Sequence, residues 1–232
     1  AGADLNALTY DQLIEWAAAV HTAVGEPKFG FPAGPDGLRH RYFQGYLYPS
    51  YTDGVVRTFA SDAAVEAWEM FRRLWEHTNP ASTNFNFMQE QLLSGDAWIV
   101  FDHSSRVANA FNERPDDFVA FPAPAGPTGR GFMPVLAGLA IPATAPDQDA
   151  ARALVQYLLQ PETQIATLRA TNFFPVVDVE LPGDLPPSVQ AAGAAIAAMS
   201  NAPDANPGLL PAGLGSKGGD FNRIFIDTFE RI

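Results

Sequence analysis

The sequence contains no cysteine, which excludes disulfide bonds, thiolate nucleophiles and cysteine-ligated metals. Lysine is scarce as well, since it occurs only at Lys28 and Lys217 and the other basic residues are scattered arginines. The formal net charge is -12, from 26 acidic and 14 basic residues. Nucleic acids and anionic membrane surfaces are therefore not expected partners. No stretch approaches the ~18 continuous apolar residues of a membrane span.

Motifs of common enzyme and cofactor sites are also missing. There is no G-x-S-x-G and no H-E-x-x-H, and the four histidines are scattered without metal-ligand spacing. The glycine-rich GLGSKGGDF at 213–221 lacks the Walker order, because Lys217 precedes the glycine pair. We therefore expect no cofactor and no metal. A pair of catalytic carboxylates stays open, because their spacing is set in space rather than in sequence.

What is present is a globular chain with ample material for a core. It has 232 residues, of which 47% are hydrophobic and 12% aromatic. The opening AGADLNALTYDQ has neither the basic nor the apolar segment of a signal peptide. We expect either a cytoplasmic protein or a targeting segment that lies outside these residues.

Capping residues and apolar periodicity predict helices separated by short strands. Thr9 and Gln12 form a capping box, and Ser61 caps the clearest helix. The buried face of that helix is predicted to carry Val65, Trp68, Phe71, Leu74 and Trp75. Further helices are expected over 38–49, 86–94, 104–111, 147–159, from 161, from 187 and over 218–232. Strands are expected over 28–31, 98–101, 118–121 and 136–141. This alternation predicts the α/β class.

The strongest site candidate follows the predicted buried strand WIVF. Its apolar run stops at the polar residues 102–106, of which Asp102, His103, Ser104 and Arg106 could bind a polar ligand. Side chains at the carboxyl end of a strand in an open α/β sheet project into the crevice where ligands bind. The alternative is that Asp102 and Ser104 only cap a helix and that Arg106 lies on the surface.

Two further stretches are weaker candidates. The aromatic GLRHRYFQGYLYPSY contains Arg39, His40 and Tyr42, and aromatic faces can stack on sugar rings, although most such residues lie in cores. In GRGFMPVLAGLAIP, small residues allow close backbone approach to a ligand or simply pack a sheet. Arg39, His40, Arg41 and Arg106 leave an anionic ligand open.

Five stretches in order give the chain a family resemblance. They are LTYDQLIEWAAAV with KFGF, FASDAAVEAWEMFRRLWEHTNP, FMQEQLLSGDAWIVFDHSSR, FVAFPAPAGPTGRG with LAGLAIPATAPDQDAARALVQYLLQPETQ, and FFPVV. In this order they resemble the extracellular solute-binding proteins of ABC importers, in the family that includes maltose-binding protein. The resemblance covers nearly the whole chain.

The resemblance implies a periplasmic-binding-protein-like fold of type II. Residues 1–136 would form the second lobe, 137–182 a crossover segment of a largely missing N-terminal lobe, and 183–232 the C-terminal helices that return to the second lobe. It places Phe132, Val135, Leu136 and Ala137 at the hinge crossover beside the ligand. Ser105 stands where the family often has a tryptophan, so polar contacts would replace stacking there.

The resemblance also implies a function without catalysis. The protein would bind a small solute such as a carbohydrate or polyol in an interlobe cleft and deliver it to ABC permease subunits. It would be extracellular or periplasmic, tethered to the membrane through a segment outside these residues. Two alternatives remain: a sugar hydrolase that uses Asp102 with a distant acid, and the ligand-sensing domain of a regulator. The absence of a basic helix argues against the regulator.

Overall fold

The computed structural model describes residues 4–52, 54–136, 138–211 and 213–232. In these ranges the chain is rich in helix and its strands are short. The α-helices are α1 (Tyr10–Val24), α2 (Arg39–Tyr42), α3 (Tyr48–Thr52), α4 (Asp62–Trp75), α5 (Gln89–Ser94), α6 (Ala108–Glu113), α7 (Gln148–Leu158), α8 (Pro161–Thr171), α9 (Pro187–Ser200) and α10 (Gly218–Phe229). The strands are β1 (Phe29–Gly30), β2 (Ile99–Val100), β3 (Arg130–Phe132) and β4 (Ala205–Pro207). Short 3-10 helices are η1 (Leu5–Ala7), η3 (Pro80–Asn84), η4 (Ser104–Arg106) and η5 (Gly215–Lys217), and η2 (Phe43–Leu47) is a π-helix.

The strands form two small parallel sheets. β1 pairs with β2, with Phe29 opposite Ile99, and β3 pairs with β4, with Arg130 opposite Ala205. In each pair the two strands are far apart in the sequence and helices lie between them, as parallel pairing requires. The helix-rich structure is consistent with the predicted α/β class, while the type II arrangement stays a prediction.

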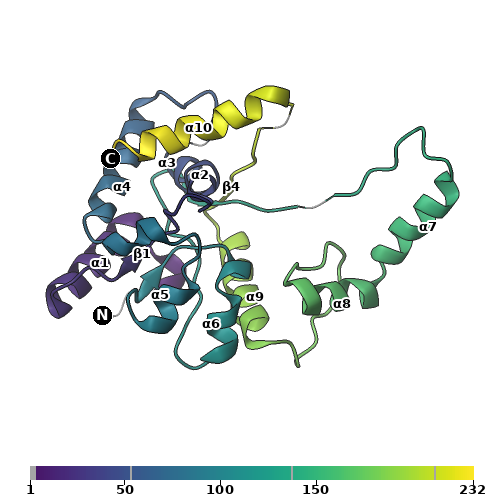
Figure 1. Cartoon of the computed structure of the whole chain (residues 1–232), viewed down its shortest axis with the longest axis horizontal. Helices are drawn as coiled ribbons and strands as arrows, with labels where there is room; N and C mark the ends of the chain where they lie inside the picture. The colour runs from purple at the N-terminus through teal and green to yellow at the C-terminus, as the bar shows by residue number, and fades with distance from the viewer. Residues whose placement is uncertain (1–3, 53, 137, 212) are drawn as a thin grey trace.

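Most elements gather in one body, and the segment 138–182, here called the arm, extends from it (Figure 1). In the body α10 lies against α2 and α9 lies against α6. The arm carries α7 and α8. Helix α8 contacts the body through Leu168, which packs against Leu185 and Val189. The division into 1–136, 137–182 and 183–232 stays a prediction, and the arm lies within the second of these ranges.

Two of the predicted helix starts are confirmed in atomic detail. The Thr9 hydroxyl accepts from the Gln12 backbone N–H, while the Gln12 side chain accepts from the Thr9 N–H, so the capping box is complete. Ser61 Oγ accepts from the Ala64 N–H at the start of α4. The predicted face of α4 was wrong at one position, because Val65 is 60% exposed and the helix buries its alanine side instead. The buried residues of α4 are Ala64, Ala67, Met70, Phe71 and Leu74.

The predicted helix end at Pro49 was wrong, because α2, η2 and α3 run on through it to Thr52. Proline has no N–H, so in a regular α-helix the Gly45 carbonyl would lose its donor at residue 49. The chain widens into a π-turn, in which the Tyr48 N–H donates to the Phe43 carbonyl. Met133 and Gly208 approach the widened helix closely at Gly45. A Cβ added at Gly45 would lie 2.4 Å from Met133 Cβ, and one added at Gly208 would lie 2.7 Å from the Gly45 carbonyl oxygen.

An aromatic cluster forms the core between the sheet β1–β2 and the helices α2, α4 and α10. Phe31 has no exposed surface, and its ring lies 5.1 Å from that of Tyr42 and 5.2 Å from that of Phe71. Such ring pairs add roughly 0.5–1.5 kcal/mol each beyond the burial of apolar area. The cluster therefore fixes α2 against the end of the sheet where the polar residues 102–106 emerge.

Other sequence predictions need correction. Residues 118–121 and the described part of 136–141 form no strand. Val119, Leu136 and Leu139 are 71%, 79% and 70% exposed, and neither segment has a strand partner among the described residues. Phe118 and Phe121 nevertheless pack against the core clusters. Trp98 was expected inside a buried strand, but it precedes β2, is 57% exposed and lies beside the Lys28 ammonium, 5.8 Å from the ring centroid.

Candidate functional site

The polar residues 102–106 leave the sheet beside the helix α2–η2. The Phe101 N–H donates to the Gly30 carbonyl, which extends the β1–β2 pairing by one step before the chain turns away. The Phe101 ring then contacts two tyrosines of the helix, at centroid distances of 4.6 Å to Tyr42 and 4.9 Å to Tyr46. This contact sets the following residues, Asp102 and His103, against the same helix.

Asp102 is held by backbone groups. Its Oδ2 accepts from the Met88 N–H at 2.8 Å and its Oδ1 accepts from the His103 N–H at 2.7 Å. Burial raises the pKa of Asp102 from its ordinary value near 3.8 to about 6, against the opposing effects of these two bonds and of Arg106. Asp102 therefore caps the start of α5, whereas the sequence alternative made it a cap of the helix that follows it.

Two histidines bring uncharged ring nitrogens to this place. Burial lowers the pKa of His103 to about 4, helped by the nearby charges of Arg106 and Arg41. Burial also lowers the pKa of His40 to about 4, helped by Arg41, Arg39 and His103. Among the described residues, His40 Nδ1 and His103 Nε2 are buried and have no hydrogen-bond partner. Both rings are neutral at pH 7, and each can still donate or accept one hydrogen bond.

Arg106 and Arg41 supply the positive charge. Arg106 Nη1 donates to the Asn86 carbonyl at 3.0 Å, and its guanidinium lies over the Phe87 ring, 4.5 Å from the centroid. Arg41 is half-buried, and its guanidinium makes no hydrogen bond or ion pair with any residue that the structure describes. Both arginines lower the pKa of His103, as positive charges near the ring would.

Arg39, Tyr42 and Ser104 point to other surroundings. Arg39 Nη2 pairs with Glu230 Oε1 at 2.7 Å and its Nη1 donates to the Ala33 carbonyl, so it joins α2 to the end of α10. Tyr42 is 3% exposed and belongs to the aromatic core. Ser104 is exposed in η4 and caps no helix through its side chain. As they stand, these three side chains do not join the cluster of His40, His103 and the two arginines.

The crossover residues behave differently from one another. Phe132 is half-buried in β3, whereas Val135 and Leu136 are 59% and 79% exposed where the chain leaves the body. The predicted residue Ala137 lies outside the described residues. Met133, which sequence reasoning did not select, is 8% exposed, and the Tyr46 hydroxyl interacts with its backbone.

Sequence reasoning did not select three other neighbours of the site, although Tyr46 lies in the aromatic stretch that it singled out. Tyr46 reaches it from η2, and Asn86 and Phe87 bind Arg106 from the turn before α5. A signal existed for Tyr46, because it follows Tyr42 by four residues and so lies near it on a helix surface. No sequence pattern pointed to Asn86 and Phe87, because they lie about twenty residues before Arg106 and meet it only in the folded chain.

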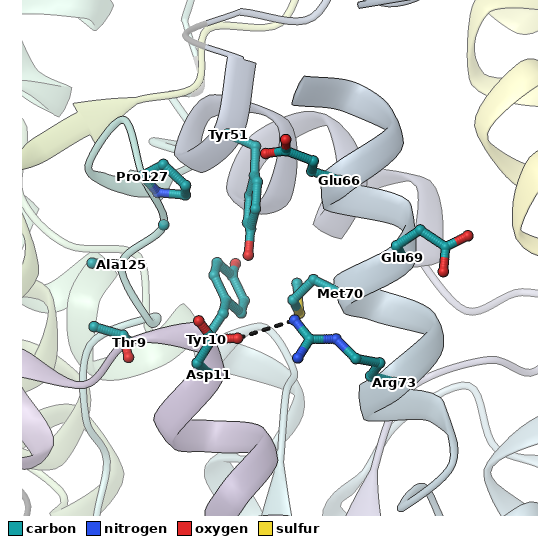
Figure 2. A pocket seen from close by; sticks show the side chains of 11 residues that line it. Thr9, Tyr10, Asp11, Tyr51, Glu66, Glu69, Met70, Arg73, Ala125 and Pro127 are labelled. Atoms are coloured by element: carbon teal, nitrogen blue, oxygen red, sulfur yellow. Dashed lines mark hydrogen bonds and ion pairs between the residues drawn. The ribbon is translucent and has the colours of Figure 1, made fainter. Parts of the chain in front are cut away.

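Two cavities are found elsewhere on the body. One of about 560 Å³ lies between the start of α1, α4 and the turn 125–127, and the Asp11–Arg73 ion pair crosses it (Figure 2). In Figure 2 the rings of Tyr10 and Tyr51 point toward one another, above this pair in the view. The other, of about 490 Å³, lies beside Arg39 and Phe229. Neither cavity is lined by His40, His103 or Arg106.

Within the described ranges, no group of three or more histidine, aspartate or glutamate side chains is arranged to hold a metal. In the same ranges, every helix is too short or too polar to cross a bilayer.

Comparison with known proteins adds the family. A family model described as bacterial extracellular solute-binding protein matches residues 1–165. No curated protein and no solved structure matches the chain. The matched range covers well over half of the sequence. Members of the family act outside the cytoplasm as solute-binding components of ABC transporters and are generally not enzymes. The chain belongs to the bacterial extracellular solute-binding proteins.

Proposed function

We propose that the chain binds a carbohydrate or related polyol for an ABC importer of the maltose-binding-protein type, at the site around His103. The observation that carries the proposal is the meeting of unused polar groups with aromatic rings. His40 Nδ1 and His103 Nε2 are buried without partners among the described residues, next to Tyr46 and Phe101. Hydroxyl-rich rings need convergent donors and acceptors together with an apolar face.

In this proposal the site is one half of an interlobe cleft. Residues 1–136 and 183–232 form the second lobe of a type II fold, and 137–182 belong to the N-terminal lobe, which covers the site and closes over the solute. The exposed apolar surface of the arm supports this, because α7 buries none of its residues and Leu154 and Tyr157 are each 57% exposed. The solute shifts the population toward the closed state, which delivers it to the permease. Tethering to the membrane stays a prediction.

A hydrolase is the alternative that one observation favours, namely the raised pKa of Asp102. The hydrogen bonds of Asp102 argue against it. Both carboxylate oxygens already accept backbone N–H groups, and no second carboxylate is among the groups that act on its pKa. A general acid needs a free oxygen directed at the leaving group.

A thermal-shift screen against sugars, polyols and their acidic derivatives tests the proposal. At a ligand concentration of 100 times Kd, binding adds about 2.7 kcal/mol to the free energy of unfolding. For a chain of this size we expect the melting temperature to rise by roughly 5–10 °C. His103→Ala should remove the rise and the matched His77→Ala should keep it, because His77 lies at the end of α4 beside His21. The absence of a rise with every compound, or a rise that survives in His103→Ala, would contradict the proposed site.

A further inference from the structure

Most basic side chains of this acidic protein are neutralised in pairs. All fourteen lysines and arginines lie in the described ranges, and ten of them make ion pairs. The four that make no ion pair with a described residue are Arg41, Arg57, Arg106 and Arg231. Arg57 and Arg231 are exposed to solvent, whereas Arg41 and Arg106 are half-buried at the candidate site. In a chain with a net charge of -12, two unpaired and partly desolvated arginines at one place need an explanation.

The carboxylate at the site does not balance these charges. Asp102 directs both oxygens to backbone N–H groups and forms no ion pair with either arginine. At pH 7 it carries at most one negative charge against two positive charges, and His40 and His103 are neutral there. The site therefore has a local surplus of one positive charge inside a strongly negative molecule.

Arg106 is also held ready for a ligand. Its Nη1 is fixed by the Asn86 carbonyl, and the Phe87 ring supports the guanidinium plane at 4.5 Å. The rest of its donor edge is unused by the described residues. A planar guanidinium held this way matches two oxygens of a carboxylate or phosphate, and its preorganisation lowers the entropy lost on binding.

We infer that the solute carries an anionic group, a carboxylate or phosphate on its sugar or polyol, which binds between Arg41 and Arg106 with the ring nitrogens of His40 and His103 beside it. This inference rests on the proposed function and narrows its substrate class. The anion cancels the surplus charge, and the histidine nitrogens bind the neighbouring hydroxyl groups. The overall negative charge of the protein repels anions, so this local positive site is also what selects where an anionic solute binds.

Matched pairs of probes test the inference by calorimetry at constant ionic strength. The pairs are galactose with galacturonate, glucose with glucose 6-phosphate, and glycerol with glycerol 3-phosphate, so that the carboxylate and phosphate arms are separate. We expect the acidic member of at least one pair to bind about tenfold tighter or better than its neutral partner.

The variants Arg41→Gln and Arg231→Gln remove the same charge at different places. The Arg41 guanidinium makes no hydrogen bond or ion pair with a described residue, and glutamine keeps part of the half-buried stem. Arg41→Gln should therefore fold normally and weaken binding of the acidic probe about tenfold, with little effect on a neutral one. Arg231→Gln should leave both affinities unchanged. If neutral sugars bind and acidic ones do not, or if the two variants behave alike, the inference is overturned and the solute-binding proposal stands. If no probe of either kind binds, both fall.

Discussion

At the residue scale, Asp102 was predicted to bind ligand, but its carboxylate instead holds two segments of the backbone together. It joins the end of β2 to the start of α5 through the Met88 N–H, and its own backbone neighbour occupies the other oxygen. A buried acid with a pKa near 6 gives a specific dependence of stability on pH. Between about pH 4 and pH 6 the folded state binds more protons than the unfolded chain, so this group makes stability fall as the pH rises.

The first prediction concerns the variant Asp102→Asn. The amide does not titrate, so the variant should lose this contribution, and its free energy of unfolding relative to the parent should rise between pH 4 and pH 7. At pH 4 the variant should be the less stable protein, because it places an amide N–H₂ where a second acceptor is needed; a lost buried hydrogen bond costs about 1–3 kcal/mol. Urea unfolding at the two pH values measures both effects. A relative stability that falls as the pH rises would show that the fold favours the ionised carboxylate.

The same scale shows which site residues the sequence could reveal. Asp102, His103 and Arg106 follow directly from a buried strand that ends in polar residues, and that pattern is local. The surroundings of Arg39 and Tyr42 depend on distant partners. Arg39 forms an ion pair with Glu230 at the end of α10, and Tyr42 packs against Phe31 and the neighbouring rings of the core. No spacing within 38–51 distinguishes the face of this helix that meets α10 from the face that meets Asp102.

At the scale of elements, the sequence predicts helix starts well and strand partners poorly. The caps at Thr9 and Ser61 depend on neighbours three residues away, and both are present. The expected strand at 118–121 needed a partner that the described chain does not provide. The π-turn at 43–47 combines both kinds of cause. The missing N–H of Pro49 is a local cause, whereas the close approach of Met133 and Gly208 at Gly45 depends on the tertiary fold.

The second prediction tests that close approach with Gly45→Ala. The added Cβ would lie 2.4 Å from Met133 Cβ, which is not the flexible end of a side chain, so the crossover must shift. We expect a loss of about 1–3 kcal/mol in the free energy of unfolding, as for other overpacked cores. Gly219→Ala is the matched control in α10, where nothing lies within 4 Å of the added carbon. The control should gain about 0.4–1 kcal/mol. A similar gain in Gly45→Ala would mean that η2 and the crossover are not packed as described.

At the scale of the whole molecule, stability is distributed unevenly between the body and the arm. α4 buries five residues in the main core, α8 buries only Leu168, and α7 buries none. The sequence predicted both helices of the arm but not this contrast, because a helical pattern does not say which surface will cover its apolar side chains. In the proposed two-lobe protein that cover is the rest of the N-terminal lobe.

The third prediction is a ranking of amide hydrogen exchange in the 232-residue chain. Amides exchange through local opening, and the free energy of opening rises with the apolar area that an element buries. We expect α7 to exchange fastest, α8 more slowly because Leu168 holds it against Leu185 and Val189, and α4 most slowly. Mass spectrometry of peptides from the three helices measures the order. Protection of α7 equal to that of α4 would mean that the arm is packed without the rest of the N-terminal lobe, and the proposal that this lobe covers its apolar face would lose its support.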